Sequence, residues 1–160
     1  MPYYAKTIDS PLGLLKLISD EQNLKSILFD AQIEDVPLFL PDVLILTQTQ
    51  LEEYFCGTRQ KFEIPLDPEG TDFQLRVWSL LEGVEYGSKQ SYLAIARELE
   101  SEKSSRAVGM ANGRNPIPIV IPCHRIVGQN GKLTGYSGGL DRKRWLLLHE
   151  QKFTTTKLLF

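Results

Sequence analysis

Three prolines within seven residues impose the strongest constraint on how this chain can fold. They stand at positions 116, 118 and 122 of the run Asn115-Pro-Ile-Pro-Ile-Val-Ile-Pro-Cys-His-Arg-Ile-Val127. Because proline has no backbone N–H and a fixed φ, this apolar run cannot form a central strand. We predict a rigid extended arm that ends in a turn at Pro122-Cys123-His124, where the thiol faces a pocket.

The turn places a thiol and an imidazole side by side, at Cys123 and His124. Thiolate is the nucleophile of cysteine chemistry, and a neighbouring imidazole commonly generates it near neutral pH. A single cysteine in an apolar run is otherwise more often a buried, inert thiol. Cys123 is therefore a candidate nucleophile, with His124 as its base, and the inert thiol is the alternative.

The composition of the 160 residues excludes several classes of protein. The two cysteines, Cys56 and Cys123, form no CxxC pair, and with only two histidines they do not predict a structural zinc site. The chain starts without an apolar leader and has no apolar run long enough to span a membrane. We expect reduced thiols, no metal, no membrane association, and a cytoplasmic protein, or a nuclear one in a eukaryote.

Charge is unevenly distributed along the chain. Residues 1–87 carry 6 Lys/Arg and 15 Asp/Glu, whereas residues 88–144 carry 10 Lys/Arg and 4 Asp/Glu. A basic half that also contains the reactive motif indicates an anionic partner for that half. A basic face that is merely solvated explains the charge equally well.

Hydrophobic periodicity predicts an α+β fold in two parts. Short alternating runs at 3–9, 12–19 and 24–29 predict a small antiparallel sheet, and residues 44–55 predict a helix that stops at Gly57. The Pro- and Gly-containing segment 64–70 is interpreted as a linker. We therefore expect an N-terminal sheet-containing domain at 1–66 and a mainly helical C-terminal domain at 72–160.

The C-terminal part contains a possible helix-turn-helix. Apolar spacing predicts helices at 72–81 and 91–99, the second capped by Ser91, and another from Ser104 or Ser105 to about Asn112. The last of these carries Arg106 among small residues, which let a helix backbone approach another surface closely. A hairpin-type turn at 128–131 and a closing helix at 141–151 complete the expected elements.

These motifs together resemble the methylated-DNA–protein-cysteine methyltransferase family, whose members repair guanine alkylated on O6. The resemblance rests on Pro-Cys-His-Arg with its upstream Asn-Pro, Ser-Tyr at 91–92, Ser-Arg-Ala-Val-Gly at 105–109 and Gly-Tyr-Ser-Gly-Gly at 135–139. It is nearly continuous from about residue 72 to residue 151. It implies irreversible, single-turnover transfer of an alkyl group from guanine O6, with thymine O4 as a further substrate position, to Cys123, without a cofactor.

The resemblance also implies catalytic roles for particular residues. Glu150 orients His124, and the Tyr92 phenol protonates the departing guanine. Asn115 braces the turn that carries Cys123. Read without the family, Glu150 is a solvated surface carboxylate, Tyr92 is a core tyrosine, and His149 is a competing imidazole that we expect to be structural.

The remaining implied roles concern the alkylated base and the DNA. The aromatic ring of the pocket loop stacks on the base, a backbone N–H meets O6, and backbone carbonyls accept the guanine amine. The residues of this pocket are Tyr136, Ser137, Gly138, Ile126 and Lys143. Arg106 fills the space of the flipped base in the minor groove. The other residues expected to contact DNA are Ser101, Lys103, Ala107, Gly109, Arg114 and Gln129.

The expected partner is double-stranded DNA that carries O6-alkylguanine, bound by a monomer with little sequence preference. Three alternatives remain from the residues: a sensor that binds the lesion without chemistry, a thiol hydrolase that uses Cys123 and His124, and a helix-turn-helix regulator. The hydrolase predicts multiple turnovers. The regulator predicts sequence-specific binding that does not need Cys123.

Overall fold

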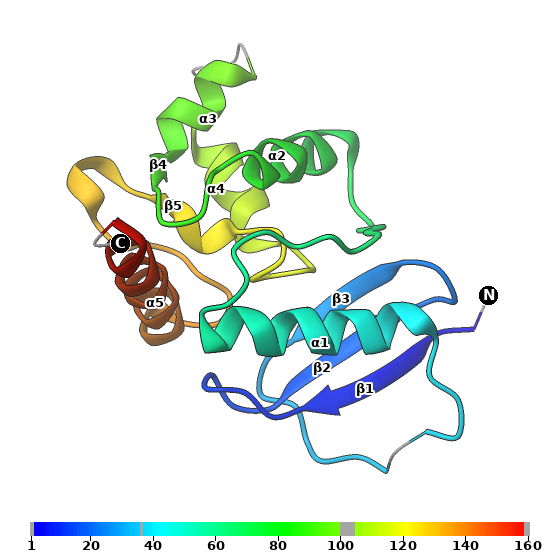
Figure 1. Ribbon diagram of the computed structural model, residues 1–160. Coiled ribbons are helices and arrows are strands. Elements are labelled where there is room, and N and C mark those ends of the chain that lie inside the picture. Colours follow the sequence, from blue (N-terminus) through cyan, green and yellow to red (C-terminus); the bar gives the residue numbers. More distant parts are fainter. Residues whose placement is uncertain (1, 36, 100–104, 159–160) are drawn as a thin grey trace. The chain divides into compact units, whose positions relative to one another are not determined.

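The computed structural model describes residues 2–35, 37–99 and 105–158, with side chains described through Thr154. It forms two compact units, Met1–Glu69 and Gly70–Phe160. The first unit contains an antiparallel sheet and one helix, and the second is mainly helical (Figure 1). The predicted α+β fold class is confirmed.

The N-terminal unit is built on a three-stranded antiparallel sheet of order β1-β2-β3. Alternation along β2 turns Leu15 and Leu17 inward, where both are fully buried, and leaves Lys16 and Ile18 on the other face. The three predicted strands are confirmed with slightly shorter bounds. These are β1 Tyr4–Ile8, β2 Leu15–Ser19 and β3 Leu24–Leu28.

Helix α1, Asp42–Cys56, packs across this sheet (Figure 1). Its buried side chains include Leu44, Leu51 and Tyr54, which complete the apolar core of the unit. The helix ends at Gly57, whose φ of 83° lies in the left-handed region. Glycine adopts this conformation without steric penalty, so the predicted stop at Gly57 is confirmed.

The segment interpreted as a linker is tied to the sheet. The Leu24 N–H donates to the Pro65 carbonyl at 2.8 Å, and the Asp67 N–H donates to the Leu24 carbonyl at 3.0 Å. Lys25 adds an ion pair to Asp67 at 2.7 Å. The chain up to Asp67 therefore takes part in the N-terminal unit instead of running free between two domains.

Four helices form most of the C-terminal unit. A capping box between Thr71 and Gln74 starts the first of them, and the predicted serine cap at Ser91 accepts a hydrogen bond from the Ala94 N–H at 3.0 Å. The closing helix is longer than predicted. The helices are α2 Asp72–Glu82, α3 Tyr92–Glu98, α4 Ser105–Gly113 and α5 Leu140–Leu158.

Helix α4 packs against both α2 and α3. Its inner face is apolar, with Val108 and Ala111 buried, and Trp78 donates from its indole N–H to the Ala111 carbonyl at 2.8 Å. Helices α3 and α4 are the pair predicted as a helix-turn-helix. Residues 100–104, which join them, lie outside the described residues.

Short elements connect the helices. Strand β4, Gln90–Ser91, pairs in parallel with β5, Ile126–Val127, a pairing that the sequence did not predict. The tight turn expected at 128–131 is confirmed: Asn130 and Gly131 have positive φ of 61° and 75°, and the Gly128 N–H donates to the Lys132 carbonyl at 2.8 Å. In the described residues, β5 before this turn pairs with β4 and not with a strand that follows the turn. None of the helices, over the residues described, has both the length and the apolar character needed to cross a membrane.

Candidate active site

The proline-rich segment is a compact turn and not the extended arm predicted. The Ile121 N–H donates to the Ile117 carbonyl at 2.9 Å, which folds the intervening residues back on themselves. Ile119 at the centre has a φ of 74°, an unusual value for a β-branched residue, and is fully buried. The prolines exclude a strand, as expected, but the segment forms a sharp turn before Cys123 and not an extended arm.

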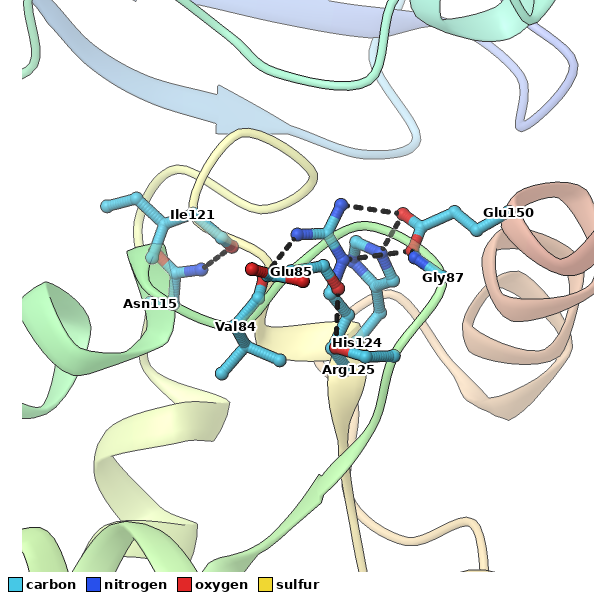
Figure 2. A network of polar contacts seen from close by, with 9 residues as sticks. Val84, Glu85, Gly87, Asn115, Ile121, His124, Arg125 and Glu150 are labelled. Atoms are coloured by element: carbon cyan, nitrogen blue, oxygen red, sulfur yellow. Dashed lines mark hydrogen bonds and ion pairs between the residues drawn. The ribbon is translucent and has the colours of Figure 1, made fainter. Parts of the chain in front are cut away.

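Asn115 holds this turn in place through both ends of its amide, and Figure 2 shows the bond from its nitrogen to Ile121. Its Nδ2 donates to the Ile121 carbonyl at 2.8 Å, and its Oδ1 accepts from the Ile117 N–H at 3.0 Å. Such side-chain bonds to nearby backbone are typical of asparagine. The strained backbone at Ile119 is therefore fixed by a buried side chain that is 5% exposed.

The next residues form a single 3-10 turn, η2 Cys123–Arg125. The Cys123 N–H donates to the Ile121 carbonyl at 2.7 Å, and Asn112 donates from Nδ2 to the Cys123 carbonyl at 3.2 Å. The tight turn sends the adjacent side chains in different directions. Cys123 and His124 are thus neighbours in sequence while His124 reaches a different partner, Glu150.

The sulfur of Cys123 is buried, with 1% of the residue exposed, contrary to the expectation that it faces a pocket. Burial raises the pKa of the thiol to about 11, with Asn115 and Lys143 acting in the opposite direction. At neutral pH the thiol is protonated. Formation of the thiolate therefore requires removal of this proton, and the role of His124 as the base stays a prediction.

A buried charge network surrounds His124 (Figure 2). Its Nε2 lies 2.7 Å from a carboxylate oxygen of Glu150, and both residues are 0% exposed. Arg125 binds the same carboxylate with two nitrogens, Nε at 2.9 Å and Nη2 at 3.0 Å. The Gly87 N–H also donates to it at 3.2 Å. The structure therefore brings His124 and Glu150 together at a site where surface solvation of Glu150 is excluded.

The network fixes the charges of its members. Burial by itself would raise the pKa of Glu150, but His124 and Arg125 together hold the pKa well below its usual range. Burial lowers the pKa of His124, although Glu150 pulls it upward. Because Arg125 is always charged, the Glu150 carboxylate keeps a counter-ion while the imidazole is neutral. The Glu150 carboxylate is therefore balanced by Arg125 whether or not the imidazole carries a charge.

The second ring nitrogen of His124 takes no part in this network. Nδ1 is buried and has no hydrogen-bond partner among the described residues. A histidine whose Nε2 binds a carboxylate carries its proton there, which leaves Nδ1 as an acceptor. His124 thus has the tautomer that a general base needs.

Tyr92 is the first residue of helix α3 and is hydrogen-bonded to Thr134. Its hydroxyl donates to the Thr134 carbonyl at 3.2 Å and accepts from the Thr134 hydroxyl at 3.2 Å. Lys143 binds the same carbonyl at 2.8 Å and the Ile126 carbonyl at 2.5 Å. Lys143 is fully buried, and burial lowers its pKa to about 8. These bonds connect the pocket loop to β5.

A hollow of about 520 Å³ opens beside Tyr92. The pocket-loop residues Tyr136 and Gly138 are buried, whereas Ser137 is exposed. Burial raises the pKa of Tyr136 well above its usual value, and the electrostatic effect of Cys123 adds to the rise. The hollow is lined by Ser91, Tyr92, Leu93, Ser105, Arg106, Gly109, Met110, Gln129, Thr134 and Gly135.

The predicted DNA contacts lie on or near the surface. Arg106, Ala107, Arg114 and Gln129 are exposed. Gly109 is half-buried, and a Cβ built there would lie 3.7 Å from the Tyr92 ring, an ordinary contact. Ser101 and Lys103 lie outside the described residues.

Metal binding has little support in this part of the chain. Over the residues described, no three His, Cys, Asp or Glu side chains are grouped so as to hold a metal ion. His149, the competing imidazole, stacks on Trp145 with ring centroids 4.7 Å apart and contacts Phe153 at 4.9 Å. It belongs to an aromatic row along α5, separate from the His124 network.

Two family models cover most of the chain. The DNA-binding domain of 6-O-methylguanine DNA methyltransferase matches residues 72–152, and the ribonuclease-like domain of the same protein matches residues 3–68. The chain belongs to the 6-O-methylguanine DNA methyltransferase family.

Relatives resemble the chain over nearly its whole length. A methylated-DNA–protein-cysteine methyltransferase of Methanosarcina acetivorans is 44% identical over 155 residues, covering 91% of this chain and 96% of the relative. The constitutive enzyme of that name from Bacillus subtilis is 39% identical over 163 residues, with coverages of 96% and 98%.

Solved structures show the same fold. The Mycobacterium tuberculosis O6-methylguanine methyltransferase superposes with a TM-score of 0.85 at 41% identity, covering 94% of each chain. The structure of Mycobacterium tuberculosis OGT in complex with DNA gives a TM-score of 0.84 at 43% identity, covering 94% of this chain and 93% of that one.

Sequence reasoning missed three residues of the site in this methyltransferase family member. Arg125 belongs to the Pro-Cys-His-Arg motif but was assigned no role, and it turns out to be the permanent counter-ion of Glu150. Asn112 lies three residues before Asn115, one helical turn away, and that spacing was a usable signal. Thr134 had no signal, because only the fold brings it to Tyr92.

Proposed function

We propose that this protein repairs DNA by transferring an alkyl group, typically methyl, from guanine O6, or from thymine O4, to its own Cys123. The observation that carries the proposal is the 2.7 Å contact of His124 with Glu150, buried beside a buried cysteine. The family membership supports the substrate. The occurrence of DNA in a related complex supports DNA as the partner.

The transfer begins with proton removal from the thiol. His124 accepts the Cys123 proton as general base, and its positive charge is balanced by Glu150. The sulfur attacks the alkyl carbon in line, so an S–C bond forms while the C–O6 bond breaks. The electron pair of that bond stays on the guanine, and Tyr92 supplies a proton to the base as it leaves. The Lys143 ammonium stabilises the negative charge on the sulfur before the attack. The proton that His124 took from the thiol then replaces the one that Tyr92 gave up, so the net change moves the thiol proton to the guanine.

The base is held by the pocket loop and by β5. The Tyr136 ring stacks on the guanine, a backbone N–H near Ser137 and Gly138 meets O6, and the carbonyls of Cys123 and Ile126 accept the guanine amine. These carbonyls already accept from Asn112 and Lys143. A carbonyl oxygen has two lone pairs, so each can accept a second bond from the base.

The buried sulfur requires a movement before the reaction. Because only 1% of Cys123 is exposed, we propose that an incoming guanine displaces the pocket loop at 133–139. The loop is attached through Thr134 to Tyr92 and Lys143, so its outer part can move while its base stays fixed. Binding of the alkylated base and exposure of the thiol are therefore coupled.

The DNA contacts follow from helix α4. A base inside a duplex cannot reach the thiol, and rotating it out of the stack takes about a few kcal/mol. Arg106 fills the vacated space from the minor groove, next to the small residues Ala107 and Gly109. Arg114, Gln129 and Ser101 bind the backbone without reading the sequence. A monomer with little sequence preference can act on any DNA, in the cytoplasm or in a nucleus.

The chemical stability of the alkylated cysteine predicts how many lesions each protein molecule can repair. An S-alkylcysteine thioether has no carbonyl for water to attack, so the protein should repair one lesion per molecule. We expect mass spectrometry after mixing with a duplex that carries one O6-methylguanine to show a gain of one CH2 on the Cys123 peptide, with repair ending at one equivalent. An unmodified peptide, or turnover beyond one equivalent as in a thiol hydrolase, would contradict the proposal.

The charges of the site predict a bell-shaped pH dependence of alkyl transfer. Burial lowers the pKa of His124, and protonation below that pKa removes the base, so the rate falls as the pH drops through a value below the ordinary histidine range. Loss of the Lys143 charge above about pH 8 weakens attraction to the forming thiolate, so the rate declines there. The measurement uses the free alkylated guanine base, which needs no rotation out of DNA. A tenfold rise per pH unit up to about pH 8.5, as for an ordinary thiol, would contradict it.

A further inference from the structure

The exposed face of helix α4 has an unusual composition. From residue 105 to residue 115, the exposed positions are Arg106, Ala107, Met110 and Arg114, and the other positions are half-buried or buried. This stretch contains no Asp or Glu. Arg106 lies four residues before Met110 and Arg114 lies four residues after it. The two arginines therefore flank this large apolar side chain along one stripe of the surface.

Met110 projects from this stripe. It is 58% exposed, although an apolar side chain of this size is stabilised by burial. Single exposed apolar residues are common on protein surfaces, and Leu148 on α5 has a similar exposure of 57%. Exposure alone therefore gives Met110 no function.

Its surroundings distinguish it from Leu148. Met110 lines the hollow of about 520 Å³ beside Tyr92 and also a second hollow of about 270 Å³ between α2 and α4. The second hollow is lined by Thr71, Phe73, Gln74, Ala107, Met110, Ala111 and Arg114. Met110 thus separates the two hollows, and an arginine lies on either side of it along the chain.

We propose that Met110 is an apolar wedge that packs against the base pair next to the flipped guanine and helps hold the duplex open. The assignment rests on the proposed function, in which α4 enters the minor groove and Arg106 occupies the place of the flipped base. Met110 follows Arg106 by one helical turn, about 6 Å along the axis. That distance lies between one and two base-pair steps of about 3.4 Å each, so the methionine reaches the step beside the vacated position.

The chemistry of the stripe supports this role. Proteins that bind the minor groove insert apolar side chains, methionine among them, between base steps that they unstack. The unstacked base exposes an apolar face, which the methionine covers as it loses contact with water. The flanking arginines bind the phosphates on both sides and keep the wedge in register. Methionine is flexible, so it adapts to steps of different sequence.

The test compares two substrates that share the chemical step. The rate of Cys123 alkylation is measured with a duplex that carries one O6-methylguanine and with the free alkylated guanine base, which has no stack to open. We expect Met110→Ala to lower the duplex rate about tenfold and to leave the free-base rate within about twofold of the original protein. Met110→Leu, which keeps an apolar tip, should retain the duplex rate within about threefold.

The matched control is Leu148→Ala, which truncates a side chain of the same exposure away from α4 and should leave both rates unchanged. The free-base rate also shows that each variant is folded. An unchanged duplex rate in Met110→Ala would overturn the wedge, and so would an equal fall with both substrates, because Met110 would then serve the pocket. Absence of alkylation in the original protein would instead reject the proposed function.

Discussion

Replacing Cys123 with serine is expected to lower the rate of alkyl transfer by at least about 10,000-fold, the scale on which loss of a covalent nucleophile acts in other enzymes. The hydroxyl occupies the same buried position but forms an anion far less readily than a thiol. Affinity for a duplex that carries the lesion should be retained, because the thiol is 1% exposed and the proposed contacts of Arg106, Ala107 and Gly109 with DNA lie on α4, away from the thiol. The measurements are single-turnover alkyl transfer and equilibrium binding to a labelled duplex.

The chain offers a matched control in its other cysteine. Cys56 is free and exposed on helix α1, so Cys56→Ser makes the same chemical change outside the site. It should leave both rate and affinity unchanged. If alkyl transfer survives in Cys123→Ser and is lost in Cys56→Ser, the alkyl acceptor is Cys56 and not Cys123.

Replacing Glu150 with glutamine should reduce both stability and activity. Arg125 makes two hydrogen bonds to the carboxylate and is itself 6% exposed. Removal of the negative charge leaves this guanidinium buried without its counter-ion, which lowers the free energy of unfolding by about 3–5 kcal/mol. The alkylation rate should fall about 100-fold, because the imidazolium formed during transfer loses its stabilising charge. Denaturant unfolding and single-turnover kinetics measure the two effects.

A third readout separates catalysis from stability in this variant. Glu150 pulls the pKa of His124 upward, so removing its charge should lower that pKa further. The acid limb of the pH–rate profile should therefore move to lower pH. Glu52→Gln makes the same change at an exposed position on α1 and should alter none of the three measurements. An acid limb that stays in place would show that Glu150 acts only on stability.

The fold was largely predictable because local patterns and tertiary packing agree. The alternation in β2 and the apolar spacing in α2 and α3 each correspond to a buried face in the structure. The stop at Gly57 and the cap at Ser91 depend only on neighbouring backbone, so they could be located from sequence. The two-residue parallel pairing of β4 with β5 has no such local signature.

The candidate site was predictable in its members but not in its electrostatics. The motif gave Cys123 and His124, and the family resemblance gave Glu150 and Tyr92. Neither indicated that burial would keep the thiol protonated, because desolvation depends on everything packed around the sulfur. The positive φ of Ile119 was likewise hidden, since a proline-rich run excludes a strand without specifying which turn replaces it.

By itself, the sequence determined which groups are chemically able to react and which segments could not become regular strands, because residue type and proline geometry act locally. The tertiary structure decided which of those groups meet. It brought Glu150 of α5 to His124, set Arg125 against the Glu150 carboxylate, and buried the sulfur of Cys123. Distances between residues far apart in the chain, and the exclusion of water that shifts their pKa values, exist only once the C-terminal unit has folded.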